Sequence, residues 1–263
     1  MRIRLAVLVV TLVAASVMAS SQFYIPAMGS VTSATVNYYT QFRVINHRDK
    51  TQKVRVDWIG HDGIGSQDGV LVMILGANVT QLTTGVAGIA PESAALGSAR
   101  FVAIDDNGNP DPGGSISGEA VIIGLRRADG ARLTETVAGI PLESMRVDNS
   151  DPRGMIFYPV SLGSMRANYG IVNDSDLEDV YEIDANAIAS PTTWRETVLV
   201  PAHAMVQRAL TADLGADTDS VIVTVRKLGQ TSGTWTAYIS SIDRITSDAV
   251  LVPALPINGR LSP

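Results

Sequence analysis

Oxygen-bearing side chains occur at every second position between residues 105 and 111. They are Asp105, Asn107, Asn109 and Asp111. Carboxylate and amide oxygens are the ligands that Ca²⁺ prefers in proteins. The EF-hand pattern is not met, because Ile116 stands where the closing glutamate would be and no helical pattern flanks the loop. The spacing leaves two interpretations open: a calcium site, or a hairpin loop of the kind that Gly, Pro and Asp favour.

The other residues with catalytic potential do not form a motif. His47, His61 and His203 stand alone, whereas a zinc site needs several nitrogen or sulfur ligands at close spacing. Residues 114–118 have an isoleucine where a nucleophile elbow has its serine. Carboxylates are numerous, but no local spacing points to the acid pair of a glycosidase. The sequence therefore predicts a protein that is not an enzyme and has no cofactor, with calcium at residues 105–111 left open.

The tryptophans raise a second binding hypothesis, in which an exposed ring stacks against a sugar. Trp58 and Trp235 lie in alternating segments, on the side that carries the apolar residues, so we expect both in the core. Trp194 follows Pro191 and two threonines, and it is the tryptophan that we expect at the surface. A carbohydrate-binding module that uses Trp194 is therefore one alternative function.

Apolar residues recur with a period of two, which is typical of strands with one buried face. Residues 53–58 alternate without a break and place Trp58 and two valines on one side. Residues 221–226 and 235–240 follow the same pattern, and clusters of turn-forming residues separate such segments. We therefore predict an all-β protein made of antiparallel, immunoglobulin-like sandwiches with at most one or two short helices.

Residues 201–215 interrupt this alternation and predict a helix. A proline near the start, helix-forming residues inside and a glycine at the end are typical of helix boundaries. Val206, Leu210 and Leu214 fall on one face at helical spacing. Residues 76–82 occupy the corresponding place in the first half of the chain. We expect one short helix across the opening of a sandwich.

Two phrases of the sequence occur twice. Residues 23–30 are echoed by residues 157–164, and residues 41–46 by residues 168–173. Two copies of one module explain this repetition, and the polar segment 148–154 is a suitable linker between them. We therefore divide the chain into a first β-sandwich domain over residues 20–150 and a second over residues 151–263.

The amino terminus has the three parts of a secretory signal. Arg2 and Arg4 precede an apolar run that ends in small residues at Ala19. The run is shorter than the roughly 20 residues that a spanning helix needs, so we expect cleavage after Ala19. No later segment approaches that length, and we expect no membrane span in the mature chain. The predicted location is the periplasm, the cell surface or the extracellular space.

Composition limits the classes of molecule that the mature chain is expected to bind. There are no cysteines, so no disulfide stabilises the fold. Removal of the two arginines of the signal leaves 18 basic against 26 acidic residues, a net charge of −8. Such a chain repels nucleic acid at long range, and no basic tract follows a phosphate backbone. Protein partners or self-association, with glycans as an alternative, are therefore the expected interactions.

Several packing motifs together resemble a tandem β-sandwich repeat found in uncharacterised secreted proteins of environmental bacteria. They lie at residues 23–27, 44–46, 201–207, 235–243 and 252–254. The resemblance covers most of residues 23–256 and implies fold and export, but no chemistry. The first half departs from it, because residues 120–124 lack the aromatic-Ala-Tyr phrase of the last strand.

A second resemblance is to the periplasmic chaperones of pilus assembly, which also carry a signal and two immunoglobulin-like domains. Residues 43–46, followed by residues 50–56, are similar to such chaperones, whose two domains however differ from each other. Repetition, export and the lack of catalytic motifs favour a non-catalytic structural or protein-interaction module of the cell envelope or extracellular space. The carbohydrate-binding module and the pilus-assembly-type chaperone are the alternatives.

Overall fold

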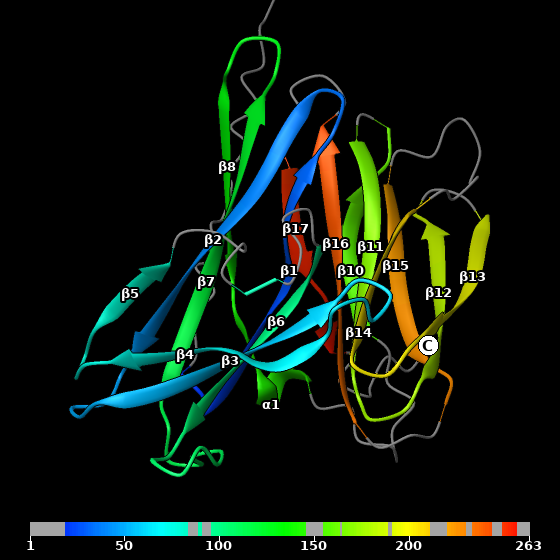
Figure 1. Ribbon diagram of the computed structural model, residues 1–263. Helices are drawn as coiled ribbons and strands as arrows, with labels where there is room; N and C mark the ends of the chain where they lie inside the picture. Colours follow the sequence, from blue (N-terminus) through cyan, green and yellow to red (C-terminus); the bar gives the residue numbers. More distant parts are fainter. Residues whose placement is uncertain are drawn as a thin grey trace, which may run out of the picture.

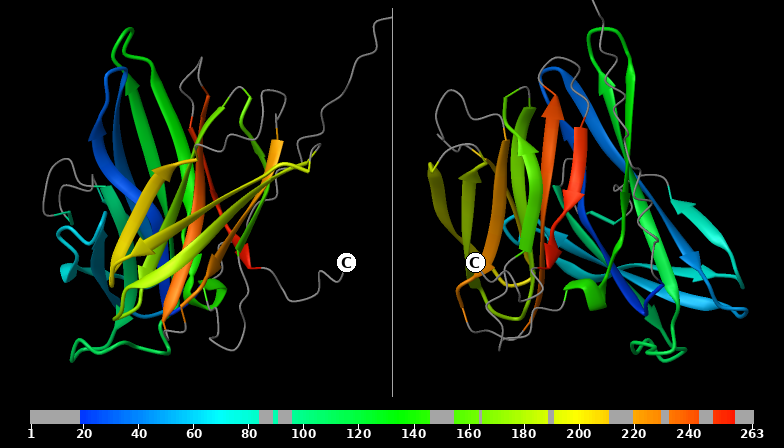
Figure 2. Two further views of the ribbon diagram at one scale, coloured as in Figure 1. Left: turned by 90° about the vertical axis from the view of Figure 1, so that its right-hand side faces the viewer. Right: turned by 180° about the vertical axis from the view of Figure 1, so that it is seen from behind.

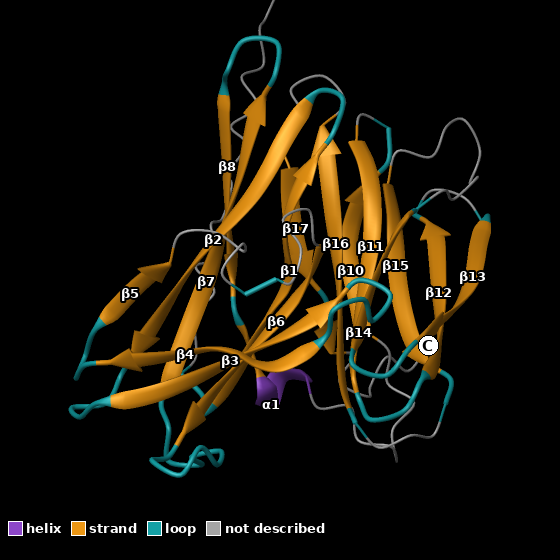
Figure 3. Ribbon diagram, in the orientation of Figure 1, coloured by secondary structure: helices purple, strands orange, loops and turns teal. Residues whose placement is uncertain are grey.

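The computed structural model describes residues 19–83, 89–90, 96–145, 155–163, 165–188, 191–210, 220–229, 233–243 and 249–256. These residues form antiparallel sheets and one short helix, α1 (Leu142–Met145) (Figures 1 and 3). The prediction of an all-β, sandwich-like fold is therefore confirmed. The predicted signal before Ala19, the linker at 148–154 and the tail after residue 256 lie outside the described residues.

The first half is one nine-stranded sheet that folds over into two layers. One layer holds β4 (Gln67–Leu75), β3 (Gln52–Gly60), β6 (Leu96–Ile104), β1 (Gln22–Thr32) and β9 (Ile140–Pro141). The other holds β5 (Thr80–Thr83), β2 (Val36–Asn46), β7 (Ile116–Arg126) and β8 (Arg132–Ala138). β1 joins the layers, because it pairs with β6 up to Gly29 and with β2 from Ser30 onward.

The second half consists of two separate sheets. The larger holds β13 (Thr193–Val200), β12 (Asp179–Ala187), β15 (Ser220–Lys227), β10 (Met155–Ser161) and β18 (Leu255–Pro256). The smaller holds β14 (Ala204–Ala209), β11 (Met165–Asp174), β16 (Thr234–Asp243) and β17 (Ala249–Pro253). Strands pair here in the same order as their counterparts in the first half. The finer assignment to tandem immunoglobulin-like domains stays an interpretation.

The period-two pattern places the expected side chains in the two cores. In the first half, Phe101 stacks on Phe23 with ring centroids 4.5 Å apart and meets Phe42 edge-on at 5.2 Å. In the second half, Trp235 lies 5.1 Å from Tyr181, ring centroid to ring centroid. Trp58 and Trp235 are both buried, which confirms the prediction that they belong to the core.

The echoed asparagines have the same structural task in both halves. Asn46 is the last residue of β2 and Asn173 the second to last of β11, and both are completely buried. The side-chain amide of Asn46 donates to the carbonyls of Lys50 and Gly76, both at 2.8 Å. The amide of Asn173 donates in the same way to carbonyls of the loop after β11 and of Pro201. Each asparagine thus ties two loops to the end of a strand.

The predicted helix over residues 201–215 is wrong where the chain is described. Residues 204–209 form strand β14, which pairs with β11, and residues 211–219 lie outside the described part. Val206 packs in the second core, whereas Met205 packs against the core of the first half. A strand buried on both faces is apolar at successive positions, so the period-two signal is lost. The corresponding segment of the first half forms β5, which pairs with β2.

The two halves lie side by side, and the smaller sheet of the second half packs against the first (Figures 1 and 2). Along β11, Ile171 faces the second core, while its neighbour Val172 belongs to the buried cluster of the first half. Met205 and Tyr238 belong to the same first-half cluster. Within the described residues, no helix is long and apolar enough to span a membrane.

Candidate functional site

The loop at residues 105–111 uses its side chains to hold its own turn. The Asp105 carboxylate accepts the backbone N–H groups of Asn107 and Asn109, both at 2.9 Å. Asp111 forms an ion pair with Arg48 at 2.6 Å, and this bond lowers the pKa of the Asp111 carboxyl. The geometry is that of a stabilised hairpin loop, and the calcium interpretation stays a prediction.

The described histidines and Trp194 do not form one site, although His61 pairs with Met205 and thus lies in a loop close to that of His203. His47 bonds Ser117 at 2.6 Å, and His203 lies between two aspartates at the boundary of the halves. Among the described residues, no group of three or more His, Asp or Glu side chains is arranged to hold a metal ion. Trp194 is half-buried and packs against the second core.

The edge strand β4 is one candidate contact surface. β4 ends its layer and, among the described strands, pairs with β3 alone. Met73 and Leu75 point into the core, while Val72 and Ile74 are 51% and 65% exposed. From Gly69 to the end of the strand there is no charged residue.

The equivalent edge strand of the second half, β13, has a different composition. Arg195 pairs with carboxylates on β12, and Glu196 accepts hydrogen bonds from Tyr169 and Arg208. Charged side chains protect an edge strand against pairing with another chain. β13 carries this protection in its centre and β4 does not.

A buried polar network joins the halves. Asp174, which is 3% exposed at its side chain, accepts hydrogen bonds from the Tyr24 hydroxyl and, at 2.9 Å, from Arg100. Arg100 also pairs with the buried Asp57. Burial and then the Asp174 carboxylate raise the pKa of Tyr24. The network fixes the two halves relative to each other, because its partners come from both.

Two hydrogen bonds between loops, next to this network, also hold the halves together. The loop between β3 and β4 donates the Asp62 N–H to the Met205 carbonyl at 2.8 Å. The Ser66 hydroxyl donates to the His203 carbonyl at 2.6 Å. Asp62 and His203 both have positive φ values, of 54° and 46°, a conformation that is uncommon outside glycine. Neither contact had a signal in the sequence, because each depends on how two distant loops meet.

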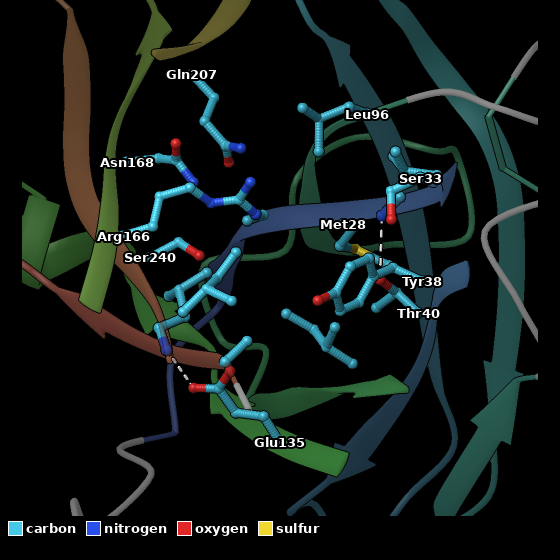
Figure 4. Close-up of a pocket in the computed structure, with 17 residues that line it drawn as sticks. Met28, Ser33, Tyr38, Thr40, Leu96, Glu135, Arg166, Asn168, Gln207 and Ser240 are labelled. Carbon is cyan, nitrogen blue, oxygen red and sulfur yellow. Dashed lines mark hydrogen bonds between the residues drawn. The ribbon is translucent and has the colours of Figure 1, made fainter. Parts of the chain in front are cut away.

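A cleft opens between the halves, next to the point where Leu251 of β17 bonds Glu135 of β8. It has a volume of about 220 Å³, and both halves supply its walls (Figure 4). Its principal apolar side chains are Met28, Leu96, Ile122, Ile242 and Leu251. Its polar ones include Tyr38, Glu135, Arg166, Asn168, Gln207 and Ser240. The cleft is thus largely apolar, with a few polar groups, which is the usual composition of a binding site for a small molecule.

Among the described residues, two charged groups line the cleft, and they are in different environments. Arg166 is exposed and makes no ion pair or hydrogen bond with another described residue. Glu135 accepts the Leu251 N–H with Oε1, while its buried Oε2 has no partner in the described structure. Burial raises the pKa of the Glu135 carboxyl to about 7, and the bond from Leu251 opposes part of this shift. Neither residue lies in a motif of the sequence, so sequence reasoning missed both.

Comparison with known proteins gives no relative from which to assign a family. No protein-family model matches the chain, and no curated protein matches it. The edge strand β4 and the cleft are the described features that bear on function.

Proposed function

We propose that this chain is an exported, non-catalytic protein-interaction module of the bacterial envelope or extracellular space, and that it associates with a second copy of itself through β4. The observation that carries the proposal is the apolar, uncharged part of the β4 edge from Gly69 to Leu75. Its outer side pairs with no described strand, and Val72 and Ile74 are exposed beside it. Such an edge is a template for the addition of another strand.

Antiparallel pairing of two β4 strands suits this edge. The same surface is used on both molecules, so the contact closes into a two-fold symmetric dimer. No charge lies between Gly69 and Leu75, so no like charges oppose each other across the pairing. The charged centre of β13 disfavours the same contact at the equivalent edge.

Substitution of one exposed residue on each edge tests the proposal. Ile74→Lys puts a charge on β4, and the matched control Leu199→Lys puts one on β13, where Leu199 is 52% exposed. We expect the wild type and the control to form a concentration-dependent dimer, measured by light scattering and sedimentation velocity. Ile74→Lys should weaken dimerisation about tenfold or more, equal to about 1.4 kcal/mol.

Two results would contradict the proposed dimer. A wild-type chain that stays monomeric at all concentrations, or a dimer that Ile74→Lys does not weaken, would contradict self-association through β4.

Mass spectrometry of the protein recovered from its native envelope tests export. A mass equal to that of the chain from Ser20 onward supports cleavage after Ala19, and the mass of the uncleaved chain contradicts it.

A further inference from the structure

The wall of the cleft that the second half supplies is a patch of hydrogen-bond donors. Arg166 and Asn168 are two residues apart on β11 and therefore lie on the same face of the sheet. Ser240 on β16 is the direct cross-strand partner of Asn168. Gln207 on β14 lies opposite Gly170, the next residue on that face. Figure 4 shows Arg166, Asn168, Gln207 and Ser240 together on this side.

The arginine of this patch differs from other arginines of the structure. Arg100 and Arg195 each pair with carboxylates of the protein, whereas Arg166 pairs with none of the described residues. A guanidinium presents two parallel N–H groups that match a carboxylate, and it binds such groups more strongly than a neutral donor would. Arg166 is therefore available to bind an external oxyanion.

The amide of Gln207 is held in an orientation that suits the same ligand. The Tyr238 hydroxyl donates to Gln207 Oε1 at 2.7 Å. This bond occupies the acceptor end of the amide, so the Nε2 donors are left for the cleft. Gly170 makes the arrangement possible, because a Cβ at this position would lie 2.0 Å from the Tyr238 ring.

The other residues that line the cleft determine which apolar group of a ligand fits and in which orientation the ligand binds. Met28, Leu96 and Ile122 form an apolar wall opposite the donor patch. The unpartnered Oε2 of Glu135 repels a carboxylate when Glu135 is ionised, and thus disfavours the reversed direction of binding. We propose that this cleft binds a small apolar monocarboxylate, with its carboxylate on Arg166 and its hydrocarbon body against the apolar wall.

Calorimetric and NMR titrations of the full-length mature protein test this proposal. The probes are octanoate and 3-phenylpropanoate, and the corresponding primary amides serve as uncharged controls. We expect saturable binding of the acids, with shifts in the amide signals of the strands that carry the donor patch, and binding of the amides that is weaker by about tenfold or more.

Two arginine variants separate the role of the cleft from general charge. Arg166→Gln should weaken binding of the acids by about tenfold or more, since it removes a charge-assisted bond. Arg226→Gln is the matched control, because Arg226 is also exposed but lies on β15 of the other sheet. Its binding should equal that of the wild type.

Three outcomes would overturn the proposal. The acids do not bind at millimolar concentration, or the amides bind as well as the acids, or Arg166→Gln and Arg226→Gln have the same effect. Ile74→Lys should bind the acids like the wild type, so failure of the dimer and failure of the cleft are distinguishable.

Discussion

The burial of Glu135 makes the stability of the fold depend on pH. Its carboxyl has a pKa of about 7 because it is largely buried, whereas an exposed glutamate titrates near 4.3. The folded state therefore binds the proton more tightly than the unfolded state. The resulting stabilisation is present at low pH and is lost as the pH rises from about 4.5 through 7. Among the residues that the structure describes, Arg166 and Tyr38 are the other titratable groups that line the same cleft.

We expect Glu135→Gln to remove this dependence on pH. Gln keeps the acceptor for the Leu251 N–H but carries no charge, so the variant should gain stability over the wild type as the pH rises from 5 to 8. The gain should be about 1–2 kcal/mol, because partial contact with solvent reduces the full effect of the shift. Urea unfolding at both pH values measures it. The exposed Glu178→Gln is the control, and an equal gain in that variant would refute the explanation.

At the scale of elements, the centre of β11 is shaped by the absence of a side chain at Gly170. The ring of Tyr238 on β16 crosses the backbone at this point and is completely buried. A Cβ on residue 170 would lie 2.0–2.5 Å from three atoms of the Tyr238 side chain, at positions that a packed ring cannot leave without disturbing its neighbours. Gly170 thus sets how closely β11 and the tyrosine that faces the first half can approach.

Gly170→Ala should therefore destabilise the fold by about 1–3 kcal/mol through overpacking. Gly113→Ala is the control, because Gly113 is exposed and the nearest neighbour of an added Cβ is 3.3 Å away. Its free energy of unfolding should change by about 0.5 kcal/mol or less. Thermal and urea unfolding give both values, and equal effects would show that the Tyr238 ring is not the cause.

At the scale of the whole molecule, a polar network within an apolar contact holds the halves together. Removal of Asp174 leaves the Tyr24 hydroxyl and part of the Arg100 guanidinium without their partner from the second half. We expect Asp174→Ala to lower the free energy of unfolding by about 3 kcal/mol, as for other buried ion pairs that lose one member. It should also split the unfolding transition, because the second core consists of residues of the second half and most of the first core consists of residues of the first half.

Asp176→Ala is the matched control for the network. Asp176 is two residues away and 95% exposed, so its contact with His203 is a surface pair of little energy. Its unfolding should stay within about 0.5 kcal/mol of the wild type. Scanning calorimetry distinguishes the two variants, and a single unchanged transition in Asp174→Ala would contradict the proposed role of the network.

The sequence by itself determined the all-β class and much of the two cores. Trp58 and Trp235 could be placed because the side-chain period of a strand is a local property that a short segment reveals. The same reasoning failed at β14, because Met205 and Val206 are covered by different halves of the molecule. Local periodicity cannot indicate a neighbour that the chain brings from elsewhere.

Only the tertiary structure decided where the halves touch and where the cleft opens. Tyr24 and Asp174 are 150 residues apart, and neither lies in a pattern that announces an interface. Arg166 and Glu135 line the same cleft. Arg166 has no described partner, and Glu135 has a buried oxygen without a described hydrogen-bond partner. These properties arise from contacts between distant strands and from burial, which are fixed when the two halves pack and not by any local order of residues.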